Sequence, residues 1–293
     1  MASRTALLLV NVNSRGGGQP LDTAFNVLKT AGIGIRHLAP ESANDISTAI
    51  LREAKGASMV IVAGGDGTLN AAARAAVESD LTLGILPLGT ANDLARTLDI
   101  PMSLEGAAKV IADGRTRHID AGVVNGHHFF NVASIGLASD IAQNLTRENK
   151  RRLGRFSYPV AALRALSSAG SFHAEIINND QHLHVRTLQI AVGNGRFYGG
   201  GNAVERDAAV DDGYLDLYSL EFSNVWKMAL MLKSFRTGHQ GLWNEVRTHK
   251  CKKFEVRTSR PKPVNVDGEI VTETPAIFEV LPKAVSVFAP SEV

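Results

Sequence analysis

Three glycine-rich segments of the chain combine residue types that suit phosphate chemistry. Residues 11–18 read NVNSRGGG, residues 64–70 read GGDGTLN, and residues 89–93 read GTAND. Each segment follows an apolar run and precedes a helical pattern, so each is expected near a helix N-terminus, where free N–H groups and the positive dipole end favour phosphate. Glycine lets the backbone approach phosphate oxygens closely, although a single glycine can equally serve a tight turn. Three such segments together predict nucleotide binding.

Asp66, inside the second segment, is an unusual residue for a phosphate loop. An acidic side chain there would repel a bare phosphate, but it suits a site in which Mg²⁺ lies between carboxylate and phosphates, or in which the carboxylate handles a proton. The chain has no G-x-x-x-x-G-K-[ST] pattern, which excludes a P-loop enzyme. A G-x-G-x-x-G pattern that starts at Gly65 fails at Asn70. These features favour phosphoryl transfer over hydride transfer.

The elements that must position these segments alternate between apolar runs and helical patterns. Apolar runs occur at 7–10, 33–38, 59–62 and 81–86, and a helical pattern follows each of them. Short apolar strands separated by helices indicate a parallel sheet covered on both faces. In such a sheet the segments after the strands share one edge, where open α/β sheets bind ligands. The sequence predicts an α/β N-terminal domain with a doubly wound parallel sheet over residues 1–122.

From about His118 onward the pattern changes to successive strand-like runs divided by turn signals such as Asn-Gly and Asp-Gly. These runs are 129–135, 172–177, 183–192, 214–220, 253–258 and 276–281. Helical patterns at 154–168 and 223–235 interrupt them. The sequence predicts a mostly antiparallel β-sandwich C-terminal domain over residues 123–282, with residues 283–293 as a candidate segment to return to the first domain.

Composition limits the remaining classes. The chain has 293 residues, 44% apolar and 20% charged, which is typical of a globular protein of about two domains. A net charge of +2 does not support a DNA-binding protein steered by its charge. The single cysteine, Cys251, excludes an internal disulfide. The N-terminal apolar run is too short for a secretory signal, and no run approaches the roughly 20 residues of a membrane span. A cytoplasmic location is therefore expected.

The motifs resemble those of a known family. GGDGT at 64–68 and GTANDLAR at 89–96 are similar to the signature of the diacylglycerol kinase catalytic family, which includes soluble bacterial lipid kinases and is related to sphingosine and ceramide kinases. YGGG at 198–201, DDGYLD at 211–216 and VDGE at 266–269 match its pattern in its order. The resemblance covers nearly the whole chain. It implies the two-domain fold of NAD kinases and diacylglycerol kinases.

The resemblance implies an ATP site between the two domains. The residues that would bind ATP are Asn11, Ser14, Arg15, Gly64, Gly65, Asp66, Gly67, Thr68, Leu69, Asn70 and Thr90. Asp66 and Asp93 would belong to the catalytic centre, and Glu269 would be the base that accepts the proton of the lipid hydroxyl. The residues alone do not decide whether Asp66 or Glu269 is the general base. We favour Glu269, because a phosphate-loop aspartate is better placed for a metal.

The resemblance also implies a bound Mg²⁺ near the Asp-Gly motif. Its ligands would be the carboxylate of Asp212 and backbone carbonyls near Ala209 and Tyr214, with Asp120 joining through water. The first glycine-rich segment departs from the family pattern, because the usual Asn-Pro-x-Ser-Gly reads NVNSR at 11–15. Arg15 is a candidate to replace a lysine that some members carry just afterwards.

The predicted function is that of an ATP- and Mg²⁺-dependent lipid kinase, with conversion of diacylglycerol to phosphatidic acid as the first choice. The alternatives are an NAD kinase or another small-molecule kinase with the GGDG motif, and a non-catalytic regulator that binds nucleotide or lipid. The expected partner is a membrane lipid, met by transient peripheral contact at the inner membrane surface, without nucleic acid; a homodimer is left open. Basic clusters at 147–155 and 250–262 are either solvated faces or contacts for anionic headgroups.

Overall fold

The structure, a computed structural model, describes residues 4–11, 21–137, 139, 170–178, 181–195, 197–198, 202–203, 209–221 and 246–290. The helical patterns predicted at 154–168 and 223–235 lie outside these residues. The helices in the described part all belong to the first half of the chain. They are α1 (Asp22–Thr30), α2 (Ile46–Glu53), α3 (Asp66–Glu78), α4 (Asp93–Thr97) and α5 (Leu104–Asp113), with a 3-10 turn at Ala43–Asp45. None of these described helices has the length and apolar character needed to cross a membrane.

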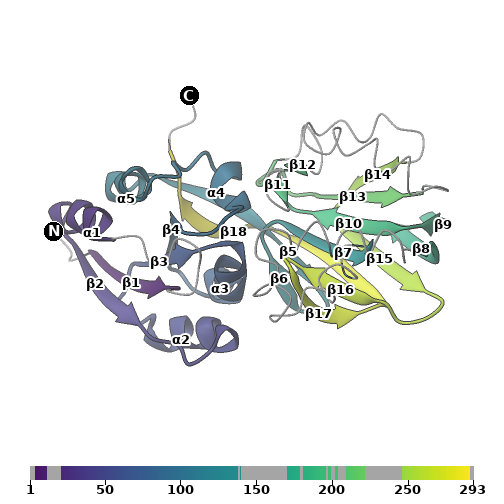
Figure 1. Ribbon diagram of the computed structural model, residues 1–293, viewed down its shortest axis with the longest axis horizontal. Helices are drawn as coiled ribbons and strands as arrows, with labels where there is room; N and C mark the ends of the chain where they lie inside the picture. Colours follow the sequence, from purple (N-terminus) through teal and green to yellow (C-terminus); the bar gives the residue numbers. More distant parts are fainter. Residues whose placement is uncertain are drawn as a thin grey trace, which may run out of the picture.

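A parallel sheet forms the core of the N-terminal part. Its strands are β1 (Arg4–Val10), β2 (Ile33–Leu38), β3 (Met59–Gly64) and β4 (Thr82–Pro87), in the order β2-β1-β3-β4. Every residue of β3 is buried, because helices cover both faces of the sheet: α1 and α5 lie on one side and α2 and α3 on the other (Figure 1). The predicted doubly wound parallel sheet is confirmed.

The C-terminal part is a sandwich of antiparallel strands, as predicted. One layer is a separate six-stranded sheet of β14 (Val246–Cys251), β13 (Leu215–Leu220), β10 (Gln189–Gly193), β7 (Val132–Gly136), β16 (Pro263–Val266) and β17 (Glu269–Glu273). The other layer continues the large sheet with β5 (Thr116–Val124), β6 (His127–Phe129), β8 (Phe172–Asn178), β9 (Gln181–Thr187), β15 (Lys253–Thr258) and β18 (Ala276–Phe288). A short ribbon pairs β11 (Phe197–Tyr198) with β12 (Asn202–Ala203). Apolar side chains from both layers, such as Ile135 and Phe254, form a second core between them.

Two long strands join the halves. β18 pairs with β15 at its start, and its last residues lie parallel to β4, where Val287 faces Leu83. β5 runs antiparallel to β18 along almost all of its length, with a register shift between Leu281 and Val285. The strand predicted at 276–281 is therefore longer than its apolar pattern, and it belongs to both halves of the molecule (Figure 1).

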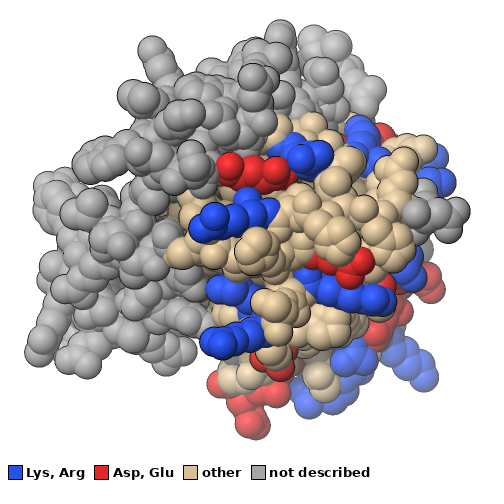
Figure 2. Space-filling model, turned by 90° about the vertical axis from the view of Figure 1, so that its right-hand side faces the viewer, with Lys and Arg blue, Asp and Glu red and all other residues tan. Residues whose placement is uncertain are grey.

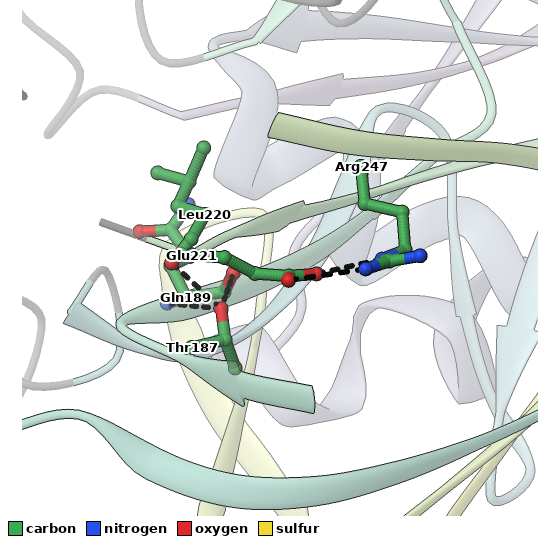
Figure 3. A network of polar contacts seen from close by, with 5 residues as sticks. All are labelled: Thr187, Gln189, Leu220, Glu221 and Arg247. Carbon is green, nitrogen blue, oxygen red and sulfur yellow. Dashed lines mark hydrogen bonds and ion pairs between the residues drawn. The ribbon is translucent and has the colours of Figure 1, made fainter. Parts of the chain in front are cut away.

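The run predicted as one strand at 183–192 is two strands in different sheets. The chain leaves β9 at Thr187 and enters β10 at Gln189. The buried Thr187 hydroxyl lies 2.8 Å from the carbonyl oxygen of Gln189 and 2.9 Å from that of Leu220, and it accepts the Gln189 N–H at 3.2 Å (Figure 3). Beside this crossing, Glu221 forms an ion pair with Arg247. One threonine hydroxyl thus contacts backbone groups of two strands at the point where the chain changes sheet.

Candidate active site

The glycine-rich segments that the structure describes lie together at the C-terminal edge of the parallel strands. Gly64 ends β3, Gly65 precedes α3, and the N–H of Leu88, after β4, donates to the Gly64 carbonyl at 2.9 Å. The N–H of Asn11, after β1, donates to the Ala63 carbonyl at 2.9 Å. The first N–H groups of α3 have no partner within the helix and carry its positive dipole end. Of the predicted ATP-binding residues, Ser14 and Arg15 lie outside the described residues.

The side chain of Asp66 connects two of these segments. Its Oδ1 accepts the backbone N–H of Asp93 at 2.7 Å, with that of Leu94 at 3.4 Å, so it caps the N-terminus of α4. Asp66 itself is half-buried at the start of α3. Asp93 is buried and only 3% exposed. The hydrogen bond that links it to Asp66 is made by its backbone N–H. Asp66 thus combines a structural contact with a position at the helix N-terminus where phosphate is expected.

The glycines of this edge serve two different purposes. A Cβ atom on Gly65 would lie 2.9 Å from the Cα of Gly89, and a Cβ on Gly89 would lie 2.6 Å from the Cα of Gly65. A Cβ on Gly64 would lie 2.6 Å from the Cβ of Thr68. These three glycines allow protein segments to approach each other. Gly67 is exposed, and a Cβ there would meet no atom within 4 Å, so it is the glycine whose open space suits an approaching phosphate.

The other predicted ATP-binding residues differ in how accessible they are. Thr68 is buried, and its hydroxyl accepts the Nδ2 group of Asn11 at 2.8 Å. Leu69 belongs to the hydrophobic core. Thr90 is exposed at the tip of the segment between β4 and α4. Asn92, next to it, has φ 51° and forms two hydrogen bonds with Gly89, which set the shape of this tip.

Asn70 links this edge to the C-terminal part of the chain. With its side-chain amide oriented to satisfy its neighbours, its Nδ2 donates to the carbonyl of His128 at 3.1 Å and to Oδ2 of Asp267 at 3.2 Å. Asn70 lies on α3, one turn after Asp66, whereas Asp267 lies in the turn between β16 and β17. The contact therefore places the Asp-Gly-Glu motif beside the GGDG segment, although about 200 residues separate them in the sequence.

Asp267 was not among the predicted site residues, although the matched motif contains it. Its Oδ1 accepts the N–H of Val132 at 3.0 Å, and its Oδ2 accepts that of Phe130 at 3.3 Å. Burial raises the pKa of this carboxyl group to about 7, and the negative charge of Asp66 contributes to the increase, while the amide hydrogen bonds oppose it. The Asp-Gly pair predicts a turn, but its amide partners come from a distant segment that no local pattern reveals.

Glu269, the predicted base, is the first residue of β17 and lies opposite Val266. The residue is exposed, and its carboxylate makes no hydrogen bond or ion pair with any residue in the described part of the chain. It follows Asp267 by two positions, on the same turn that reaches Asn70. The turn thus brings a carboxylate that has no partner among the described residues to the side of the molecule where the GGDG segment lies.

A divalent cation fits the Asp66 side of this arrangement if it arrives with phosphate. No group of three or more His, Cys, Asp or Glu side chains that could hold a metal occurs among the described residues. Mg²⁺ commonly takes one or two carboxylates and completes its coordination with substrate phosphates and water. The carboxylates of Asp66 and Asp267 lie close enough to interact electrostatically, so they form an acidic site next to the N-terminus of α3.

The second predicted metal site has a different character. Oδ1 of Asp212 accepts the N–H of Tyr214 at 3.0 Å, and its Oδ2 lies 2.6 Å from Nζ of Lys250. Ala209 precedes this turn and is half-buried. The carboxyl oxygens of Asp120 accept the N–H groups of Gly213 at 2.6 Å and Lys283 at 2.7 Å. The predicted ligands therefore belong to one turn, but an ammonium group already neutralises the carboxylate, and a divalent cation does not fit this arrangement.

The basic cluster at 250–262 is interspersed with acidic partners. Lys253 forms an ion pair with Glu279, and Arg257 forms one with Glu255 at 2.6 Å. On the end face of the molecule, Figure 2 shows basic and acidic side chains side by side over the described surface. The cluster at 147–155 lies outside the described residues.

Comparisons with known proteins identify relatives of both halves of the chain. A family model of the diacylglycerol kinase catalytic domain matches residues 5–124, and a model of the YegS C-terminal NAD kinase beta sandwich-like domain matches residues 131–289. A protein of Pectobacterium atrosepticum named "Probable lipid kinase YegS-like" is 37% identical over 234 residues, which are 78% of this chain and 77% of that protein. A protein of Staphylococcus epidermidis named "Diacylglycerol kinase" is 29% identical over 80% of this chain and 75% of its own length.

A solved structure has a similar fold. It comes from Bacillus anthracis str. Sterne and is described provisionally as a diacylglycerol kinase. The two chains are 27% identical, the match covers 98% of this chain and 95% of that one, and the TM-score is 0.85. Both halves of the molecule therefore have counterparts in one solved chain.

Proposed function

This chain belongs to the diacylglycerol kinase catalytic-domain family of lipid kinases, and we propose that it transfers the γ-phosphate of ATP to the free hydroxyl of diacylglycerol, giving phosphatidic acid. The family membership confirms the resemblance inferred from the sequence motifs. One observation carries the proposal furthest: the Asp-Gly-Glu turn meets the GGDG segment through Asn70 and Asp267. Acidic groups from both halves of the chain thereby gather beside a helix N-terminus.

The triphosphate would lie at the N-terminus of α3. The free N–H groups there, together with the open space at Gly67, suit phosphate oxygens that approach the backbone. Mg²⁺ bound with the triphosphate would neutralise part of its charge, and the carboxylate of Asp66 would hold it. Asp66 has one oxygen committed to the amides of α4, which fixes its orientation. Asn11 and Thr68 support the segment from inside through their mutual hydrogen bond.

Glu269 is the proposed base. Asp66 already accepts backbone N–H groups, and Asp267 accepts two or more, whereas the exposed carboxylate of Glu269 has no partner among the described residues. It would accept the hydroxyl proton as the lipid oxygen attacks the γ-phosphorus. The bond between the γ-phosphorus and its bridging oxygen then breaks, and ADP leaves with that oxygen. Catalysis would rest on positioning and charge neutralisation, as is usual for phosphoryl transfer.

Diacylglycerol is the first choice among lipid alcohols, in line with the names of the relatives. The acceptor would be a membrane lipid, reached by transient contact of the protein with the membrane surface. A sphingoid base or phosphatidylglycerol offers the same reactive group, and NAD is the acceptor of a different kinase class with a GGDG segment. The proposal therefore requires a direct comparison of acceptors.

The test is transfer of radiolabel from [γ-³²P]ATP to a panel of acceptors presented in mixed micelles, with NAD in a parallel reaction. We expect label in phosphatidic acid when diacylglycerol is supplied and none in NAD. Label in another lipid alone would replace the substrate, and label in NAD alone would contradict a lipid acceptor. ATP binding without transfer to any acceptor would favour the non-catalytic regulator. The variant Glu269→Gln serves as the control for contaminating kinases.

A further inference from the structure

The turn at residues 210–214 carries an unusual density of acidic side chains. Asp211 and Asp212 lie in the turn, Asp216 follows at the start of β13, and Asp120 on β5 contacts the turn from below. Such a concentration of carboxylates is what a bound divalent cation would ordinarily neutralise. The contacts of each carboxylate show whether the turn needs one.

Two of these carboxylates already have partners in the protein. Arg117 on β5 donates to Oδ2 of Asp211 from Nε at 2.9 Å and from Nη2 at 2.6 Å. The residue Asp120 is 1% exposed, and its two oxygens accept the backbone N–H groups of Gly213 and Lys283 at 2.6 and 2.7 Å. Asp120 therefore fastens the turn to β18 as well as to β5. Arginine and backbone amides neutralise these two groups without a metal.

Lys250 on β14 neutralises the third carboxylate. It lies opposite Asp216 in the antiparallel pairing of β13 and β14, and its Nζ reaches Oδ2 of Asp212 at 2.6 Å. The same Nζ lies 5.9 Å from the centre of the Tyr214 ring, and Nζ of Lys252 lies 5.6 Å from that centre. One ammonium group therefore contacts the carboxylate that the family resemblance assigns to a divalent cation, and a second lies over the neighbouring Tyr214 ring. The positive charge of Lys250 would repel a divalent cation at Asp212.

We propose that the ammonium group of Lys250 is the structural cation of the 210–214 turn and replaces a divalent metal ion there. Through Asp212, Lys250 ties the edge strand β14 to a turn that Asp120 and Asp211 hold on β5. The folded turn then requires no divalent ion. This inference concerns the fold of the turn and goes beyond the proposed reaction.

Thermal unfolding of the full-length protein without ATP tests this proposal, with Tm measured in excess EDTA and in excess Mg²⁺. Lys250→Met keeps the aliphatic length of the side chain and removes the charge. We expect the wild-type Tm to be the same in both solutions, and we expect Lys250→Met to lower it by about 2–4 °C in both. The double variant Lys250→Met with Asp212→Asn should recover most of this loss, because it also removes the uncompensated carboxylate. Lys252→Met is the matched control, since Lys252 contacts the same ring without an ion pair to Asp212 in the described structure.

A wild-type Tm that rises with Mg²⁺, and no longer does so in Asp212→Asn, would show that a divalent ion displaces Lys250 and would overturn the proposal. A Lys250→Met variant as stable as Lys252→Met would overturn it as well, because the ammonium group would then have no structural role. A rise with Mg²⁺ that persists in Asp212→Asn would come from another site and, together with a destabilised Lys250→Met, would support the proposal.

Discussion

The carboxylate of Asp66 accepts the backbone N–H of Asp93 at 2.7 Å, and this hydrogen bond fixes the start of α3 to the start of α4. Both helices begin at the same edge of the parallel sheet, directly after β3 and β4. The positive ends of their dipoles therefore lie close to one carboxylate. One oxygen of Asp66 holds the two helices in place, and in the proposed mechanism its negative charge would face a metal bound to phosphate.

Substitutions of Asp66 should separate its structural contact from its charge. Asp66→Asn keeps an oxygen that can accept the amides of α4, so we expect a folded protein with an almost unchanged Tm. Loss of the negative charge should lower kcat by about 10²–10³-fold, the size found when one electrostatic contact to a transition state is removed. Asp66→Ala should show the same loss of activity and in addition lose about 1 kcal/mol of stability, as for a deleted helix cap.

The control is Glu78→Gln at the other end of α3, where the carboxylate is exposed and paired with Arg74. It should leave kcat unchanged, because exposed ion pairs contribute little. Steady-state kinetics measure kcat, and thermal unfolding measures the stability, of all three variants. Full activity of Asp66→Asn would remove the charge of Asp66 from the mechanism.

Gly89 and Gly67 should respond oppositely to alanine. Gly89→Ala places a Cβ 2.6 Å from the Cα of Gly65 and 2.7 Å from Oδ1 of Asn92, so the two segments must separate. We expect a loss of about 1–3 kcal/mol in the free energy of unfolding, as for an overpacked core. Gly67→Ala meets no atom within 4 Å and lies inside a helix, so stability should stay equal or rise by up to about 1 kcal/mol.

ATP titration completes this comparison. If phosphate approaches Gly67 closely, Gly67→Ala should weaken ATP binding although the protein is no less stable. Unaltered affinity in a stable Gly67→Ala variant would mean that the triphosphate lies elsewhere along the edge. Urea unfolding and calorimetric titration measure the two quantities independently.

The sequence alone predicted the parallel sheet, the sandwich and the edge at which the glycine-rich segments gather, because apolar periodicity and glycine turns are local signals. It did not predict the close backbone approach that excludes a side chain at Gly65 and Gly89. Gly65 and Gly89 contact each other across two loops, and this contact exists only once β3 and β4 are paired. Local sequence patterns carry no information on the close contact between these two segments.

The structure differs from the sequence-based prediction at two further places, and in both the reason is a tertiary contact. Thr187 divides an apolar run into strands of different sheets, because its hydroxyl satisfies the backbone at a crossing that sequence periodicity does not mark. Asp267 belongs to a motif that was recognised, but its three amide partners lie in the turn that begins at Phe130. Its raised pKa is a property of that tertiary contact and could not be read from the Asp-Gly pair.

Glu269→Gln should lower kcat strongly with no loss of stability. The residue is exposed, and its side chain makes no hydrogen bond or ion pair with the described residues, so the amide should be tolerated by the fold. A glutamine cannot accept the hydroxyl proton, and the loss of a general base typically lowers the rate by about 10²–10⁴-fold. The KM for ATP should change little, because the proposed role concerns the lipid hydroxyl.

Glu273→Gln is the matched control, since Glu273 is exposed on the same strand. Its kcat should equal that of the wild type. If both variants retain activity, Asp66 becomes the remaining candidate for the base. If both lose it, the effect arises from β17 as a whole and not from the carboxylate of Glu269.

The raised pKa of Asp267 leads us to expect a specific dependence of the free energy of unfolding on pH. Burial raises the pKa of its carboxyl group from 3.8 to about 7 in the folded protein. Between these two pH values the folded state binds more protons than the unfolded state, so the contribution of Asp267 to the free energy of unfolding falls as the pH rises. The fall should begin near pH 4, end near pH 7, and amount to at most about 4 kcal/mol for a shift of this size.

Asp267→Asn isolates this contribution, because the amide does not titrate. The variant loses acceptor contacts with the turn at Phe130 and should be less stable than the wild type at pH 4. Its free energy of unfolding should nevertheless fall less steeply with pH, so the difference between the two proteins narrows or reverses by pH 7. Urea unfolding across this pH range measures the difference, with Asp113→Asn at the exposed end of α5 as the control. Parallel curves for wild type and Asp267→Asn would mean that the carboxyl group of the folded protein is already ionised near pH 4, which would contradict its raised pKa.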